Sequence, residues 1–170
     1  MQEECCSYQA GDCSEPCCSA SAKTERAPLC PQCGKRGKWV GNITLANLLK
    51  ADAKEQMQPD RYLFCEIADC PVVYYSKSGG ETFCVDEILV PVTQKSEADS
   101  TPVCYCFHHT RGSIRDEIER TGRSTVVAQI SAAVKDGRCE CEIRNPQGAC
   151  CLGNVSRAVK DAWPRVVKSR

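Results

Sequence analysis

The chain has 170 residues, enough for one domain or two small ones, and 16 of them are cysteine. Its 22 Lys and Arg residues balance 22 Asp and Glu residues, so no overall charge points to nucleic acid as a partner. No apolar run reaches transmembrane length, and the first 20 residues lack the apolar core of a secretory signal peptide. We therefore expect a cytoplasmic protein without membrane insertion, whose close cysteine pairs bind metal rather than form a disulfide framework.

The amino-terminal segment 1–28 is predicted to be a disordered, cysteine-rich tail. It consists largely of Ser, Ala, Glu and Cys and has almost no periodic apolar residues. Soft ions such as Cu(I) and Hg(II) tolerate flexible sets of thiolates, so this tail is a candidate for soft-metal capture. Its thiols are those of Cys5, Cys6, Cys13, Cys17 and Cys18. The alternative is a disordered tail whose cysteines are incidental.

Residues 29–93 are predicted to form a first module of short strands and one helix. We expect Thr44 to cap that helix, because apolar residues follow it at helical spacing: Leu45, Leu48, Leu49 and Ala53. Four segments are rich in Val, Ile, Tyr and Phe and are typical of strands: 61–65, 71–76, 82–85 and 88–92. The sequence Ser78-Gly79-Gly80 supplies a hairpin turn between two of them.

The remaining chain is predicted to be mostly helical. A polar linker at 94–102 precedes a module at 103–163, and a basic tail follows at 164–170. Ser113 is expected to cap a helix that Gly122 ends, and Ser124 a second helix that Gly137 ends. A third helix should run from about Gly148 and break before Pro164. The predicted fold class is therefore α+β, with a small strand-and-helix module before a helical one.

Two cysteine pairs in the first module predict a structural zinc site. Cys30-Pro-Gln-Cys33 is a knuckle of two thiolates on one tight turn, and Cys65 and Cys70 form a second short loop. Four cysteines in two close pairs suit a closed tetrahedral site, whose metal would stabilise a module with a thin core. The alternative is a thioredoxin-like redox motif, but the preceding βαβ pattern is missing.

The second module holds six candidates for a second metal site. Cys104 and Cys106 are separated by one residue, and four further cysteines follow: Cys139, Cys141, Cys150 and Cys151. If 138–143 is extended, Cys139 and Cys141 share a face and geometry does not choose between them. Cys150 and Cys151 lie about 100° apart on a helix, so only one should face inward. An anionic iron–sulfur cluster would suit nearby Arg111, Arg115 and Arg138 and the helix N-termini, although spacing alone leaves a second zinc site open.

Two sets of motifs resemble known families. Val103-Cys-Tyr-Cys106, followed by Thr110, Ile114, Ile118 and Gly122, is similar to the helical [2Fe–2S] domain of bacterioferritin-associated ferredoxins. Asn145-Pro146-x-Gly148-x-Cys-Cys151, with the zinc-type pairs, resembles the amino-terminal domain of archaeal CopZ-type copper chaperones. This resemblance implies zinc ligands at Cys30, Cys33, Cys65 and Cys70. It implies [2Fe–2S] ligands at Cys104, Cys106, Cys141 and Cys151, and leaves Cys139 and Cys150 as spare thiols or alternative ligands.

The resemblance implies a role in metal homeostasis. The cluster would supply single electrons, for example to reduce Cu(II) to Cu(I), and thiols would carry the Cu(I) to a metal-transporting P-type ATPase. Two alternatives remain: a ferredoxin-like electron carrier that docks to a redox enzyme, and a soft-metal sequestration protein whose cluster is structural. We expect a metal-binding or electron-transfer protein rather than an enzyme, because no catalytic triad, Gly-rich phosphate loop or carboxylate pair is found.

Overall fold

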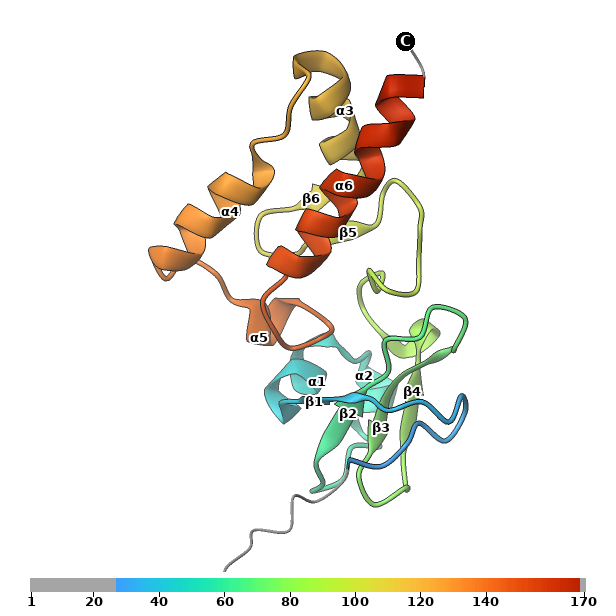
Figure 1. The fold of residues 1–170 in the computed structure, drawn as a ribbon. Helices are drawn as coiled ribbons and strands as arrows, with labels where there is room; N and C mark the ends of the chain where they lie inside the picture. The colour runs from blue at the N-terminus through green and yellow to red at the C-terminus, as the bar shows by residue number, and fades with distance from the viewer. Residues whose placement is uncertain (1–26, 169–170) are drawn as a thin grey trace, which may run out of the picture.

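A computed structural model describes residues 27–168, with side chains to Trp163. The cysteines of the predicted soft-metal tail, Cys5, Cys6, Cys13, Cys17 and Cys18, lie outside the described residues. The fold is α+β, as predicted, with a small sheet at one end and a group of helices at the other (Figure 1). Within the described part, no helix is both long and apolar enough to cross a membrane.

The sheet consists of four antiparallel strands in the order β1-β2-β3-β4. They are β1 (Lys38–Val40), β2 (Tyr62–Phe64), β3 (Val72–Ser76) and β4 (Thr82–Cys84). Side chains alternate across β2, so Tyr62 and Phe64 join the core on one face while Leu63 and Cys65 join a cysteine-lined core on the other. Both faces of the central strands are therefore buried. The predicted strands at 61–65, 71–76 and 82–85 are confirmed in this way, within one or two residues.

The predicted helix of the first module is interrupted. It consists of α1 (Asn42–Leu48) and α2 (Ala51–Lys54), because Leu49 and Lys50 adopt extended backbone angles. Thr44 does not cap the helix, since α1 begins after Gly41 and the Thr44 hydroxyl donates to the Glu142 carbonyl instead. The prediction of a strand at 88–92 is also wrong. This segment follows a short 3-10 helix, η1 (Val85–Glu87), and forms only an isolated bridge between Ile88 and Leu49.

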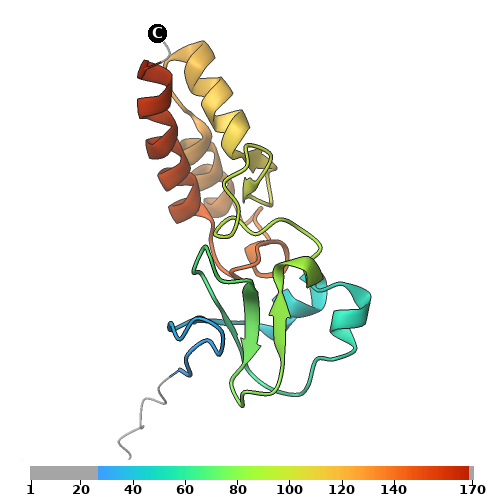
Figure 2. The same cartoon turned by 90° about the vertical axis from the view of Figure 1, so that its right-hand side faces the viewer.

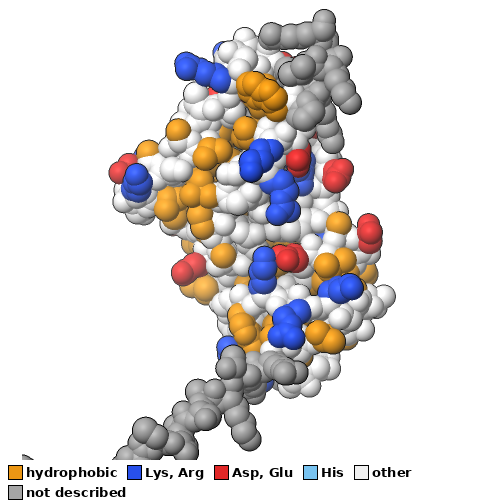
Figure 3. All heavy atoms as spheres, in the orientation of Figure 1, with side chains coloured by type: hydrophobic (Ala, Val, Ile, Leu, Met, Phe, Trp, Pro, Cys, Tyr) orange, Lys and Arg blue, Asp and Glu red, His pale blue; other side chains and the backbone are white. Residues whose placement is uncertain are grey.

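The helical part begins with a two-stranded ribbon and continues in four helices (Figure 2). The strands are β5 (Pro102–Cys104) and β6 (His109–Thr110). The helices are α3 (Arg111–Thr121), α4 (Val126–Lys135), α5 (Cys141–Arg144) and α6 (Leu152–Lys168). Buried side chains of α3, α4 and α6 form one core, with Ile114, Ile130 and Val155 at its centre. Hydrophobic side chains also gather on the surface over α4 and the adjoining part of α6 (Figure 3).

The ends of these helices differ in detail from the sequence prediction. Thr110 caps α3 and Ser113 is its reciprocal partner in a capping box, whereas Gly122 ends the helix with φ of 70°, as expected. Thr125, not Ser124, is the residue before α4. Helix α6 begins at Leu152 rather than Gly148 and continues past Pro164 to Lys168. Proline removes one backbone donor, and the buried apolar face of α6 offsets that loss.

A turn at Asn145–Gly148 joins the helical part to the sheet. The Asn145 side chain is 1% exposed and donates to the Ala149 carbonyl, which holds the turn closed. The Tyr74 hydroxyl of β3 donates to the Pro146 carbonyl at 2.8 Å. Gly148 has φ of 64°, and a Cβ there would meet Val40 Cγ2 at 2.8 Å. The turn is therefore fitted closely against the sheet, and it separates Cys141 from Cys151.

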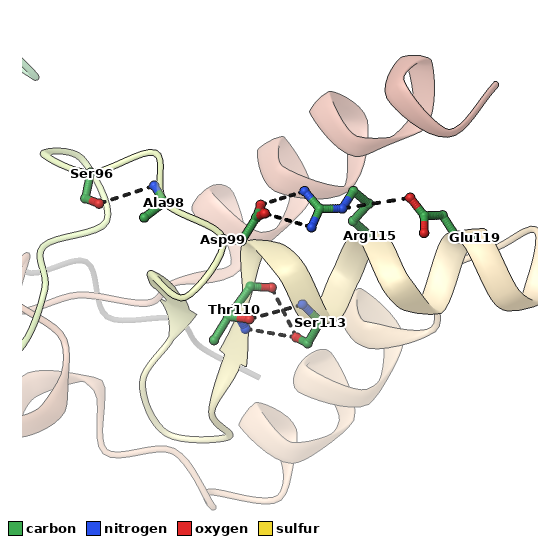
Figure 4. A network of polar contacts seen from close by, with 7 residues as sticks. All are labelled: Ser96, Ala98, Asp99, Thr110, Ser113, Arg115 and Glu119. Atoms are coloured by element: carbon green, nitrogen blue, oxygen red, sulfur yellow. Dashed lines mark hydrogen bonds and ion pairs between the residues drawn. The ribbon is translucent and has the colours of Figure 1, made fainter. Parts of the chain in front are cut away.

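The polar segment between the two parts is tied to both. Lys95 Nζ donates to the carbonyls of Ile67 and Cys70, at 2.6 and 2.9 Å, on the sheet side. On the helical side, Arg115 of α3 makes two hydrogen bonds to the Asp99 carboxylate, at 2.6 and 2.8 Å (Figure 4). These contacts fix the approach of the chain to β5.

Candidate metal centres

The first group of thiols forms a compact quartet, named here the compact site. Its members are Cys30, Cys33, Cys65 and Cys70, whose sulfur atoms all lie within 4.8 Å of one another. The Sγ atoms are 3.9 Å apart in the pair Cys30–Cys70 and 3.7 Å apart in the pair Cys33–Cys65. Four sulfurs around one zinc, each about 2.3 Å from it, stand roughly 3.8 Å apart in a tetrahedron. The thiols of the compact site therefore fit one zinc ion.

Local structure positions each half of the compact site. The Cys30–Cys33 turn closes through hydrogen bonds from Gly34 N to Cys30 O and from Cys30 N to Lys35 O, both at 2.8 Å. Gly34 provides the left-handed backbone angle that this knuckle needs, with φ of 67°. Cys65 follows β2 directly, and Cys70 lies two residues before β3, so the sheet presents the second pair to the first.

The thiols of the compact site differ in how readily they lose their protons. Burial raises the pKa of the Cys65 thiol to about 12 and also raises that of Cys70. Burial acts to raise the pKa of Cys33 as well. Hydrogen bonds from the Lys35 backbone and the neighbouring thiols outweigh this effect and lower the pKa to about 7. Zinc binding must therefore displace protons from the buried thiols, which makes affinity depend on pH.

Lys95 is a component of the compact site that sequence reasoning missed. Its ammonium group donates to two carbonyls of the Cys65–Cys70 loop, and its charge lowers the pKa of Cys65. Lys95 lies in the polar segment that the sequence suggests is a linker, and it is 25 residues from Cys70 along the chain. No local pattern marks it, because the contact exists only after the segment folds back.

The second group of thiols, Cys104, Cys106, Cys141 and Cys151, is named here the paired site. Cys104 ends β5, Cys106 lies in the β5–β6 turn, Cys141 begins α5, and Cys151 precedes α6. The Sγ atoms of Cys106 and Cys141 are 3.8 Å apart, and the neighbouring Cys151 thiol lowers the pKa of Cys104. Among the described residues, no three of these thiols have all their sulfurs within 4.8 Å. The four thiols are therefore not gathered around one point as those of the compact site are.

Backbone N–H groups point at the sulfurs of the paired site. Glu140 N donates to Cys106 Sγ at 3.3 Å, and the N–H of Cys151 donates to Cys141. The Cys151 thiol lowers the pKa of Cys104 to about 6, with help from the N–H groups of Phe107 and Cys106, while burial opposes the shift. Burial raises the pKa of Cys141 to about 12. Such donors stabilise negative charge on sulfur in a site shielded from water.

The structure corrects the prediction for segment 138–143 and confirms the one for Cys150 and Cys151. Segment 138–143 is not extended, because α5 begins at Cys141, and so Cys141 is buried while Cys139 is partly exposed. Cys151 is 1% exposed and Cys150 is exposed, so only one of these neighbours faces inward, as expected.

The predicted arginines have other partners. Arg111 donates to the Thr93 carbonyl, Arg115 pairs with Asp99, and Arg138 pairs with Asp136. Arg144 lies nearer the thiols: it pairs with Glu140 at 2.7 Å, and its pKa is raised first by that carboxylate and then by Cys106. The i,i+4 spacing of Glu140 and Arg144 could have predicted their ion pair, but not its place beside Cys106.

Comparison with known proteins identifies the first part of the chain. Residues 27–89 match the zf_CopZ family, described as a zinc binding domain. This segment is therefore similar to CopZ-type zinc-binding domains. The fold is also similar to the X-ray structure of the Archaeoglobus fulgidus CopZ N-terminal domain, with a TM-score of 0.64 and 28% sequence identity. That likeness covers 76% of this chain and 95% of the other, so it extends beyond the zinc-binding segment. No curated protein matches the chain.

Proposed function

We propose that this protein acts in metal homeostasis in the manner of a copper chaperone, with a resident zinc ion and a resident [2Fe–2S] cluster. Cys30, Cys33, Cys65 and Cys70 would hold the zinc, in keeping with the zinc-binding family match and the compact site. Cys104, Cys106, Cys141 and Cys151 would hold the cluster. Zinc closes the sheet module, and a [2Fe–2S] cluster supplies the capacity to take up and release one electron.

The observation that carries this proposal is the different geometry of the two thiol quartets. A single zinc ion requires four mutually close sulfurs, as in the compact site. A binuclear cluster has two irons with two thiolates each, which requires two close pairs separated by the width of the cluster. The 3.8 Å approach of Cys106 and Cys141, and the influence of the Cys151 thiol on Cys104, support this pairwise assignment. The structural likeness to the CopZ N-terminal domain extends past residue 89, so it is not confined to the zinc-binding segment.

The surroundings of the paired site suit an anionic, redox-active group. Cys104, Cys141 and Cys151 are buried, and backbone N–H groups offset negative charge on the sulfurs. Cys106 is partly exposed, so it is the thiol nearest to solvent and to an incoming electron donor or acceptor. Reduction potentials of such clusters depend on this combination of N–H donors and exposure.

In the cell, this protein would take copper as cargo and work with a metal-transporting P-type ATPase in the cytoplasm. The eleven described cysteines are all free thiols, which a reducing compartment would maintain. Cu(I) prefers thiolates, and the tail cysteines supply additional ones. The second candidate function is that of a ferredoxin-like carrier docking to a redox enzyme. The partly exposed Cys106 favours it, because electron transfer requires close approach to a partner.

Anaerobic purification followed by a visible spectrum and metal analysis tests the proposal. We expect two irons, inorganic sulfide and one zinc per chain. Cys106→Ser or Cys151→Ser should remove the iron and the visible absorption but keep the zinc, and Cys30→Ser or Cys65→Ser should release the zinc. A colourless protein with two zinc ions would refute the cluster assignment.

Addition of Cu(II) to the dithionite-reduced protein distinguishes the two functions. For a chaperone-type role, we expect stoichiometric reoxidation of the cluster together with retention of Cu(I) on the protein after desalting. Reoxidation with release of all copper would favour the electron carrier. An unchanged spectrum after Cu(II) addition would contradict the proposed redox role altogether.

A further inference from the structure

A surface pocket lies beside the paired site. It has a volume of about 560 Å³ and is lined by residues of α4, of α5 and of the loops on either side of α5, including Cys139, Cys141, Cys150, Glu142 and Ile143. Cys141 is 8% exposed, so it forms the buried floor of this pocket. Cys139 is partly exposed and Cys150 is exposed. Two accessible thiols that belong to neither quartet therefore line one pocket.

The position of these two thiols is set by their buried neighbours. Cys139 lies two residues before Cys141 and Cys150 one residue before Cys151, so each accessible thiol accompanies a thiol of the paired site. Cys139 and Cys150 line the same pocket as Cys141. The accessible pair is thus close to the paired site in space as well as in sequence.

We propose that Cys139 and Cys150 form a two-thiolate binding site for a soft monovalent ion, Cu(I), at this pocket. This inference deepens the proposed function and rests on it for the nature of the adjacent cluster. Cu(I) is a soft ion that thiolates bind strongly. As each sulfur binds the ion, its thiol proton leaves to solvent, so two protons are released for one Cu(I) bound and no electron is transferred.

The composition of the pocket favours Cu(I) over zinc. A structural zinc site needs four ligands, whereas the accessible thiols are two. Among the described residues, neither Cys139 nor Cys150 belongs to a group of three or more side chains with mutually close ligand atoms. The nearby carboxylate of Glu140 is engaged with Arg144. Val134 and Ile143 line the rest of the pocket and give the ion a partly apolar surrounding, which disfavours hard, strongly hydrated ions.

The location has a functional consequence. Cys141 lines the same pocket as the accessible pair, so an ion bound there lies next to a thiol of the paired site. Copper reduced at the cluster would then have thiolates at hand to retain it. The tail cysteines would receive the ion later or compete for it.

The test is a Cu(I) titration against bathocuproine disulfonate, under anaerobic conditions, in full-length protein loaded with zinc and iron. The background variant carries Ser at all five tail cysteines: Cys5, Cys6, Cys13, Cys17 and Cys18. We expect it to bind one Cu(I), with X-ray absorption showing two sulfur ligands. Cys139→Ser/Cys150→Ser should lose this equivalent and keep its iron, zinc and visible spectrum. Cys84→Ser, which removes a partly exposed thiol outside the pocket, is the matched control and should bind one Cu(I).

Each other outcome identifies what fails. Unchanged Cu(I) stoichiometry in the double variant, with the cluster intact, overturns the two-thiolate site and leaves the proposed function standing. Loss of iron in the double variant also overturns it, because Cys139 or Cys150 would then be a cluster ligand. A background protein without iron refutes the proposed function, whereas the Cu(I) count still tests the site.

Discussion

Replacement of Gly148 by alanine should destabilise the junction between the sheet and the helices. Gly148 has φ of 64°, and an added Cβ would lie 2.8 Å from Val40 Cγ2 and 3.0 Å from the Thr44 hydroxyl oxygen. The left-handed backbone of an L-residue costs about 1–2 kcal/mol. Overpacking against a buried side chain adds about 1–3 kcal/mol. We therefore expect the free energy of unfolding to fall by roughly 2–5 kcal/mol in total.

Gly122→Ala is the matched control. Gly122 has φ of 70°, and a Cβ there would meet nothing within 4 Å, so that variant carries the backbone cost alone. We expect its loss of stability to be about 1–2 kcal/mol. The excess loss in Gly148→Ala then measures the contact with Val40. Adding Val40→Ala to Gly148→Ala removes the clashing methyl group and should recover part of that excess as a coupling energy.

Urea unfolding of the metal-loaded proteins, followed by far-UV circular dichroism, provides the comparison. A second readout is the rate of iron loss under the same conditions, because the Asn145–Gly148 turn lies between Cys141 and Cys151. Equal losses of stability in Gly148→Ala and Gly122→Ala would refute the predicted overpacking, since Val40 would then move aside at no cost in free energy. A faster loss of iron in Gly122→Ala than in Gly148→Ala would contradict the assigned role of the turn.

Three further predictions concern single side chains. Lys95→Met should leave two loop carbonyls beside the compact site without a hydrogen-bond donor and lower the free energy of unfolding by about 1–3 kcal/mol. It should also speed the transfer of zinc to a chelator. Lys54→Met, at an exposed position, is the control. Arg115→Lys loses the two-pronged contact with Asp99, whose side chain is 55% exposed, so thermal denaturation should show a loss below about 1 kcal/mol. Burial acts to raise the pKa of Glu117, but hydrogen bonds from the start of α4 outweigh it and lower the pKa below its ordinary value of 4.5. The Glu117 carboxylate should therefore stabilise the fold above pH 4.5, and this contribution should be lost as the pH falls through the folded-state pKa. The loss of thermal stability in Glu117→Gln relative to the unmodified protein should accordingly shrink in acid. A loss that stays constant with pH would refute this.

The sequence alone determined the features that depend on short-range spacing. Close cysteine pairs define two-thiol loops, and Gly122 and Gly137 occupy positive-φ positions at the helix ends where the patterns expect them. Local sequence patterns located β2, β3, β4 and α4 within one or two residues, and α3 within three. These features were predictable because hydrogen bonding and side-chain direction within a few residues follow from the local backbone.

Tertiary structure decided which distant groups meet. The sequence offered six thiols for the second site, and the start of α5 at Cys141 turned Cys139 away from its neighbour. Lys95 reached the compact site only because its polar segment folds back onto the sheet. Thr44 failed as a cap because its hydroxyl bonds across the junction to Glu142. Spacing along a chain constrains only neighbouring residues, whereas the pairing of thiols depends on packing between elements far apart in sequence.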